Sequence, residues 1–238
     1  MIGKCMTFVG CLVVGGLLYA NTAVAQDEAA VEVEFTASVW ADNWFALYVN
    51  GELVGEDSVP FDTIRSFNSD TITFKATYPL TIAMVTRDYI ENDSGLEYIG
   101  SLFGFARLWD GFTFFQQMGD GGVIAQIEET GSGKIVATTS NAWRGLLIHK
   151  APLNADCEKS SQPMEDCTFK KTEEPDGWQA DDFDASAWVA ATEYTPEQIG
   201  AKFGYNDVDW DPAAKLIWTG DLKADNTILW RHKVAGPE

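Results

Sequence analysis

Hydrophobic and polar residues alternate with a period of two along much of this chain, which is the pattern of β-strands that bury one face. In residues 31–40, apolar side chains fall on one face, while glutamate, threonine and serine fall on the other. This segment therefore predicts an antiparallel strand with one solvated face. Its apolar face consists of Val31, Val33, Phe35, Ala37 and Val39.

The next segment, residues 43–54 with the sequence NWFALYVNGELV, is apolar on both faces of the strand that it predicts. The pair Asn50-Gly51 favours the positive φ angles of a tight hairpin turn, so residues 52–54 should begin the return strand. One apolar face can belong to a core, and the other face then needs a cover. The two faces are Phe45, Leu47 and Val49 on one side, and Trp44, Ala46 and Tyr48 on the other.

Further strand patterns recur at short intervals between glycine-rich turns, without a long amphipathic helix. Residues 197–203 are expected to form a helical turn after Pro196, because proline suits the first helical position. Apolar and polar side chains alternate poorly in residues 152–212, and this predicts long connections that pass over the sheets. We expect an all-β fold, an antiparallel β-sandwich of jelly-roll type with long irregular connections. The further strands are expected at residues 71–77, 80–87, 123–127, 134–139, 146–149, 215–218 and 227–234.

The first 25 residues resemble a secretory signal peptide, in which Lys4 precedes an apolar run and Ala23-Val24-Ala25 offers a small-residue cleavage site. The apolar run is too short and too rich in glycine for a membrane span of roughly 20 residues. We therefore expect a secreted protein, extracellular or periplasmic, with residues 26–238 as one sandwich domain.

The formal net charge of the chain is −20 at pH 7. A polyanion of this kind repels nucleic acid and anionic lipid surfaces, so neither is expected as a partner. Cations are the natural counterparts of such a surface. The simpler explanation is that the charge keeps an exported protein soluble.

Two of the four cysteines, Cys5 and Cys11, leave with the signal peptide. In an exported chain the remaining pair, Cys157 and Cys167, is expected to form one disulfide bond that closes the loop of residues 150–171. A metal-binding or catalytic cysteine pair is the alternative, although no further cysteine or histidine stands nearby to complete a site.

Three stretches resemble galactose-binding-like jelly-roll domains, the carbohydrate-binding modules of many secreted proteins. They are ADNWFALYVNGELV with the following glycine (residues 41–55), GWQADDFDASAWVAATEY (177–194) and KLIWTGDLKADNTILWR (215–231). The resemblance implies a sandwich of eight or more strands that binds carbohydrate through loops at one end, often with a structural calcium ion. It implies no catalytic residues. Binding residues cannot be transferred by position, because members of this family differ in those loops.

A carbohydrate site needs an exposed aromatic ring beside polar side chains, because sugar C–H faces stack on flat rings while the hydroxyls form hydrogen bonds. Three of the nine tryptophans stand beside suitable residues. The alternative for each is a ring packed in the core or under a loop. The predicted carbohydrate-binding residues are Asp42, Asn43 and Trp44; Arg107, Trp109 and Asp110; and Asn141, Trp143 and Arg144.

Other aromatic residues are expected to cover the sheets. The side chains of Trp178, Phe183 and Trp188 are predicted to act as clamps, which means that they pack against the sandwich and hold the long connection in place. The stretch LFGFARLWDGFTFF (102–115) is predicted to cover the second face of the strand with Trp44 and Tyr48; alternatively it is an exposed patch for a partner.

Two acidic runs could supply the carboxylates of a calcium site, although solvated loop acids are the commoner explanation of such runs. Neither matches the helix-loop-helix calcium motif, and the position of any metal is left open. The runs are Asp207, Asp209 and Asp211, and Asp181, Asp182 and Asp184.

Catalytic motifs are scarce. Only His149 and His232 are available, both within predicted strands, and neither a serine-nucleophile nor a zinc-peptidase motif occurs. The leading hypothesis is a non-catalytic protein that binds carbohydrate or another extracellular polymer, with a structural calcium ion. One alternative is an interaction protein that assembles through sheet edges and residues 102–115. The other is a glycoside hydrolase with an Asp/Glu pair at catalytic separation.

Overall fold

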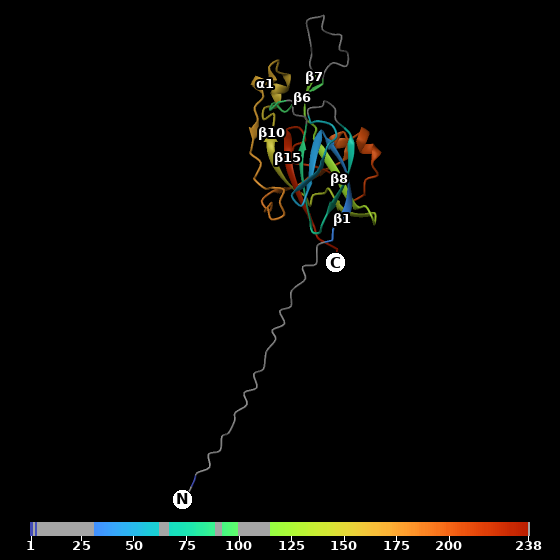
Figure 1. Cartoon of the computed structure of the whole chain (residues 1–238). Coiled ribbons are helices and arrows are strands. Elements are labelled where there is room, and N and C mark those ends of the chain that lie inside the picture. The colour runs from blue at the N-terminus through green and yellow to red at the C-terminus, as the bar shows by residue number, and fades with distance from the viewer. Residues whose placement is uncertain (2, 4–30, 62–66, 89–91, 100–114, 238) are drawn as a thin grey trace.

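Two antiparallel sheets packed face to face make up the body of the molecule in a computed structural model of the chain (Figure 1). The structure describes residues 1, 3, 31–61, 67–88, 92–99 and 115–237. The prediction of an all-β antiparallel sandwich is confirmed. Among the described residues, no helix has the length and apolar character needed to cross a membrane.

The first sheet has six strands and the second has seven, while β6 (Leu96–Ile99) and β7 (Phe115–Met118) form a separate hairpin at the end of the sandwich opposite the C-terminus (Figure 1). The order in the first sheet is β13 (Thr192–Tyr194), β14 (Leu216–Trp218), β8 (Gly122–Glu129), β1 (Val33–Asp42) and β4 (Ser69–Ala76), and β9 (Lys134–Thr138) also pairs with β8. The order in the second is β11 (Lys170–Lys171), β10 (Arg144–Lys150), β15 (Asp225–Val234), β5 (Leu80–Arg87), β2 (Trp44–Val49) and β3 (Glu52–Glu56), and β12 (Val189–Ala190) also pairs with β10.

The strands predicted from alternation are all present, with small shifts at their ends. Asn50 and Gly51 have φ angles of 51° and 87°, which confirms the predicted hairpin turn between β2 and β3. Val31 was predicted to face the core, but it lies outside β1 and is 79 % exposed. The short strands β6, β7, β11, β12 and β13 were not predicted.

In the described ranges of the chain, helical structure is confined to short turns in the connections. The expected turn after Pro196 is α2 (Pro196–Ile199), which is shorter than the predicted 197–203 because Gly200 adopts a left-handed conformation that ends it. Thr195 and Gln198 form a capping box at its start. The other turns are η1 (Ala155–Lys159), α1 (Pro163–Asp166) and η2 (Phe203–Asp207).

The main core lies between the two sheets and follows the period-two pattern. Phe35, Ala37 and Val39 of β1 belong to the same buried cluster as Phe45 and Leu47 of β2, and all of them are fully buried. The alternation of β1 therefore sets the inner face of the first sheet, and one face of β2 sets that of the second sheet.

The second apolar face of β2 is covered by the long connection that follows β11. Trp178 and Trp188 pack against Ala46 in a second buried cluster, and the rings of Tyr48 and Trp178 lie 5.8 Å apart in an edge-on arrangement. This confirms the predicted clamps. The prediction that residues 102–115 cover this face is not tested, because residues 102–114 lie outside the described part of the chain.

Cys157 and Cys167 form the predicted disulfide bond, with their Cα atoms 5.2 Å apart. Both cysteines are buried against Leu96 of β6, and Met118 of β7 packs beside them. The disulfide loop thus also supports the β6–β7 hairpin.

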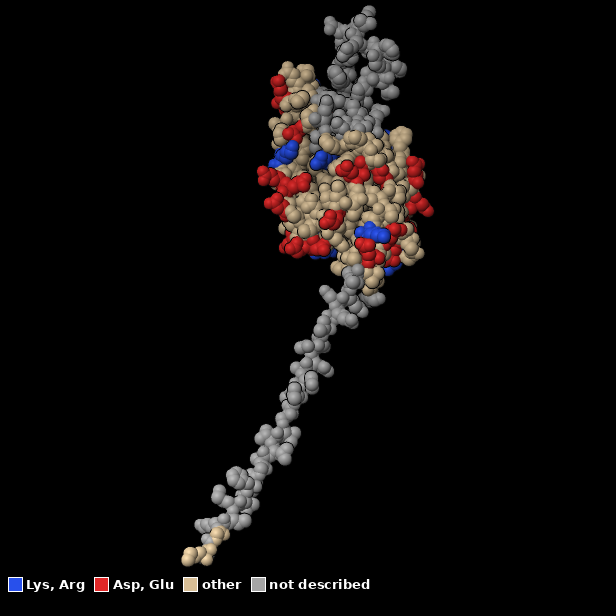
Figure 2. Space-filling model, in the orientation of Figure 1, with Lys and Arg blue, Asp and Glu red and all other residues tan. Residues whose placement is uncertain are grey.

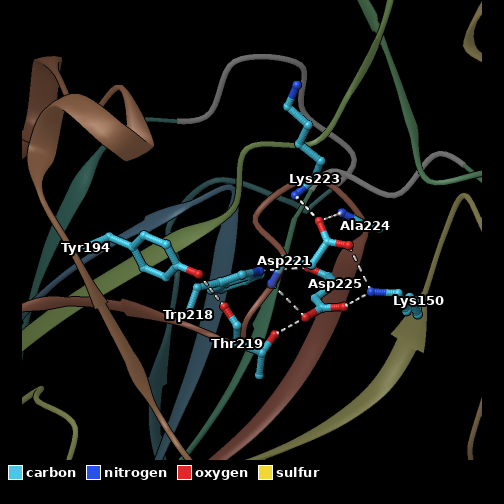
Figure 3. A network of polar contacts seen from close by, with 8 residues as sticks. All are labelled: Lys150, Tyr194, Trp218, Thr219, Asp221, Lys223, Ala224 and Asp225. Atoms are coloured by element: carbon cyan, nitrogen blue, oxygen red, sulfur yellow. Dashed lines mark hydrogen bonds and ion pairs between the residues drawn. The ribbon is translucent and has the colours of Figure 1, made fainter. Parts of the chain in front are cut away.

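A network of polar contacts ties β10 to the start of β15 (Figure 3). Asp225 is 5 % exposed, and its Oδ1 accepts a hydrogen bond from Nζ of Lys150 at 2.6 Å. Its Oδ2 accepts from Oγ1 of Thr219 at 2.6 Å and from the backbone N–H of Asp221 at 3.2 Å. Both oxygens of this buried carboxylate are therefore satisfied by donors of the protein.

We expect Lys150→Met to lower the free energy of unfolding by about 2–4 kcal/mol, because it leaves Asp225 buried without its cation. Lys171→Met is the matched control: it removes an ion pair with Asp93 whose side chains are 63 % and 40 % exposed, and should cost less than about 1 kcal/mol. Urea denaturation at pH 7 measures both changes. Equal losses in the two variants would contradict this account of the network.

Candidate functional site

The pairing of β1 with β8 brings two aspartates together at one end of the sandwich. Asp42, the last residue of β1, pairs with Gly122, the first residue of β8. Asp120 lies two residues before Gly122, in the connection from β7. The register of the first sheet therefore places Asp120 next to Asp42.

The second sheet adds a third aspartate at the same point. Trp44 pairs with Arg87, the last residue of β5, and the backbone N–H of Asn43 donates to the carbonyl oxygen of Arg87 at 2.9 Å. Asp88 follows Arg87 directly. One carboxylate oxygen from each of Asp42, Asp88 and Asp120 lies within 4.8 Å of the other two.

Glu97 of β6 lies close enough for its charge to raise the pKa of all three aspartates. Its Oε2 accepts a hydrogen bond from Nε2 of Gln117 in β7 at 2.8 Å, while its Oε1 is buried without a hydrogen-bond donor among the described residues. We call Asp42, Asp88, Glu97 and Asp120 the carboxylate cluster.

The surroundings of the three aspartates disfavour their charged forms. Burial, then Asp120 and Glu97, hold the pKa of Asp42 well above its usual range. Burial, then Glu97 and Asp42, do the same for the pKa of Asp88. Burial and Glu97 raise the pKa of Asp120 to about 6. Within the described residues, Lys202 is the one cation that acts against these shifts at Asp42 and Asp120.

A pocket of about 590 Å³ opens on the outer side of the second sheet, beside the carboxylate cluster. The two features adjoin because Arg87 lines the pocket while the next residue, Asp88, points into the cluster. Burial lowers the pKa of His149 in the pocket wall, against the opposing effect of its contact with Asn226. The lining includes Phe61, Arg87, His149, Lys171, Glu173 and Thr227.

Arg87 packs against two aromatic rings that contact each other edge to face, with their centres 6.1 Å apart. Its guanidinium carbon lies 5.1 Å from the ring centre of Trp44 and 5.1 Å from that of Phe61. No ion pair joins Arg87 to a carboxylate within the described residues. Its planar set of N–H donors is therefore fixed in orientation beside an aromatic ring, Phe61, that is 36 % exposed.

The predicted carbohydrate-binding residues are distributed over several environments. Trp44 packs against Arg87 and Phe61 at the pocket but does not itself line it. Asp42 and Asn43 are 3 % and 2 % exposed, too deeply buried to meet a surface ligand. Trp143 is 1 % exposed, which corrects its assignment as a stacking platform. Its flanking residues, Asn141 and Arg144, are exposed without an exposed tryptophan between them. Arg107, Trp109 and Asp110 lie outside the described residues.

Trp143 is a core residue for a local reason. Its indole N–H donates to the carbonyl oxygen of Thr138 at 2.9 Å, and its ring stacks on His232 with centroids 5.4 Å apart. The second predicted histidine, His149, also lies within a strand as expected. Trp143 is therefore packed in the core, which is the alternative to a sugar-binding ring that the sequence left open.

The carboxylates of the two predicted acidic runs do not form a metal-binding group among the described residues. In the part of the chain that the structure describes, the group of three acidic residues with ligand atoms close together is Asp42, Asp88 and Asp120, and it includes no member of either run. Sequence reasoning missed Asp88, Glu97 and Asp120. The available signals were an aspartate directly after the predicted strand 80–87 and an aspartate within the glycine run 119–122.

Comparison of the chain with protein-family models, with curated proteins and with solved structures finds no match. The assignment of a function therefore depends on the geometry of the cluster and the pocket.

Asp57 anchors the connection that leads from β3 to Phe61. Its Oδ1 accepts hydrogen bonds from the backbone N–H of Val59 at 2.8 Å and from Nδ2 of Asn68 at 3.1 Å, while its Oδ2 is buried without a donor among the described residues. Burial raises the pKa of Asp57 to about 6, against the lowering effect of these hydrogen bonds.

We expect Asp57→Asn to flatten the pH dependence of stability between pH 4 and 7. Because the pKa is raised in the folded state, that state binds more protons than the unfolded chain over this range, and the contribution of Asp57 to stability falls as the pH rises, by up to about 2 kcal/mol. Urea denaturation at pH 4.5 and 7.5 measures the difference. The control is Asp176→Asn, at an exposed position. Identical pH profiles for the wild type and Asp57→Asn would contradict the expectation.

Proposed function

We propose that this chain is an exported, non-catalytic binding module that holds a carbohydrate, or another hydroxyl-rich extracellular polymer, in the pocket beside Arg87. The observation that supports this proposal best is the contact of the Arg87 guanidinium with the rings of Trp44 and Phe61, since Arg87 and Phe61 both line the pocket. The resemblance of residues 41–55 to galactose-binding-like modules points to the same ligand class.

The chemistry of the pocket suits a sugar in two respects. Phe61 offers a partly exposed ring on which the C–H face of a sugar can stack, and Arg87 offers several N–H donors to neighbouring hydroxyl groups. Glu173 and Thr227 add acceptors in the same lining. A few polar groups around an apolar surface are the usual composition of a small-ligand site.

The charge of the pocket favours an uncharged ligand. Lys171 is balanced by Asp93, and the pocket lining contains Glu173 and Glu174 together with Arg87. Acidic side chains are spread over the face of the molecule seen in Figure 2, with few lysines and arginines between them. A polyanionic polymer would be repelled over most of that face.

The carboxylate cluster does not support the hydrolase alternative. Asp42 and Asp88 are 3 % and 2 % exposed, so a sugar ring cannot reach them. Glycosidases place two accessible carboxylates on either side of the scissile bond. The pocket itself contains Glu173 and Glu174 on consecutive positions of one segment rather than on opposite walls.

We expect the purified chain to bind at least one neutral glycan on an array of plant, algal and microbial polysaccharides, and Phe61→Ala to weaken that binding about three- to tenfold through loss of stacking. Arg87→Ala should weaken it about ten- to hundredfold, because it removes charged hydrogen-bond donors. Isothermal titration with the glycan that binds gives both values.

Phe203→Ala is the matched control, since this ring is 66 % exposed outside the pocket. An array without any bound glycan would refute the carbohydrate proposal. Equal weakening by Phe61→Ala and Phe203→Ala would refute the assignment of the pocket, and release of reducing sugar from a bound polysaccharide would favour the hydrolase.

A further inference from the structure

Two oxygens of the carboxylate cluster, from different strands, are buried without hydrogen-bond donors among the described residues. Asp42 is 3 % exposed, and its Oδ1 receives no hydrogen bond from the described residues. Oε1 of Glu97, from a different strand, is buried in the same condition. A buried carboxylate oxygen without a donor requires either a proton or a cation.

Asp225 shows how this protein satisfies a buried carboxylate with its own groups. As Figure 3 shows, Lys150 binds one oxygen of Asp225, and Thr219 with the backbone of Asp221 binds the other. Lys202 lowers the pKa values of Asp42 and Asp120, but within the described residues no ion pair joins a lysine or arginine to either aspartate as Lys150 is joined to Asp225. A bound cation would supply this positive charge.

We infer that the carboxylate cluster binds one calcium ion through Asp42, Asp88 and Asp120, with Glu97 as a further oxygen donor. The donors are all carboxylate oxygens, which suit a hard cation, and the cluster contains no histidine or cysteine that would favour zinc. Calcium–oxygen distances are about 2.3–2.6 Å, so two ligands of one ion lie at most about 5 Å apart. The aspartate oxygens, within 4.8 Å of one another, meet this condition.

The backbone around the cluster is shaped for this arrangement. A Cβ atom on Gly119 would lie 1.7 Å from Oδ2 of Asp88, so the main chain of the β7–β8 connection runs directly against that carboxylate. Asp120 is only partly buried, whereas Asp42 and Asp88 are buried. The ion would join four segments that are distant in sequence: the ends of β1 and β5, strand β6 and the connection before β8.

The test is calcium binding by the purified chain after treatment with a chelator, and it is independent of the carbohydrate proposal. Titration calorimetry with calcium chloride should show one ion per chain, and calcium should raise the Tm by several degrees, because an ion that binds the folded state alone stabilises it. Asp120→Asn should reduce the affinity at least tenfold. The double variant Asp207→Asn and Asp209→Asn, in an exposed acidic run, should bind as the wild type does.

Several results would overturn the inference. These are no heat and no Tm change at millimolar calcium, unchanged affinity in Asp120→Asn, loss of binding in the Asp207/Asp209 variant, or binding of magnesium in preference to calcium. Circular dichroism checks that Asp120→Asn is folded. If it is not, Glu97→Gln replaces it, with reduced calcium affinity expected and unchanged affinity again refuting the site.

A glycine pair gives a second, independent test of the geometry. Gly119→Ala places a methyl group on the Asp88 carboxylate and should lower calcium affinity at least tenfold. Gly131→Ala is the matched control, since a Cβ there meets nothing within 4 Å. Equal calcium affinities in the two folded variants would show that Asp88 does not bind the ion.

Discussion

The chain passes from one sheet to the other at a single residue, Asn43, and this crossing determines the end of the sandwich that holds both candidate sites. β1 ends at Asp42, between β4 and β8, and β2 begins at Trp44, between β3 and β5. Backbone hydrogen bonds therefore hold the crossing from both sheets. They set the buried carboxylate of Asp42 and the ring of Trp44 in fixed positions only two residues apart.

The same crossing explains why charge accumulates in the interior. Strand ends of both sheets converge there, and each brings an acid that the inner apolar faces could not accommodate. Burying an unpaired ionised carboxylate costs several kcal/mol even after relaxation, so the arrangement is stable only with protons or with a cation. At Asp225 the chain supplies that cation as Lys150. At the carboxylate cluster an external ion is the simplest physical answer.

The proposed ion and the proposed ligand pocket would be neighbours because strand side chains alternate. Arg87 faces the pocket and Asp88 faces the cluster, although one peptide bond joins them. An ion bound by Asp88 would order the end of β5 and, through it, the Arg87 guanidinium that packs against Trp44 and Phe61. In this arrangement a structural metal and a binding surface share one rigid strand end, without the metal touching the ligand.

The sequence by itself determined the two sheets, the turn at Asn50-Gly51, the disulfide bond and the clamps at Trp178 and Trp188, because alternation, turn chemistry and cysteine pairing are local signals. The tertiary structure decided which residues lie together in the carboxylate cluster and around the pocket. Strands β6 and β7 are too short to show alternation, and the cluster draws on residues from 42 to 120, which only sheet register brings together. A tryptophan in the core and one at a pocket have similar sequence neighbours, so only packing distinguishes Trp143 from Trp44.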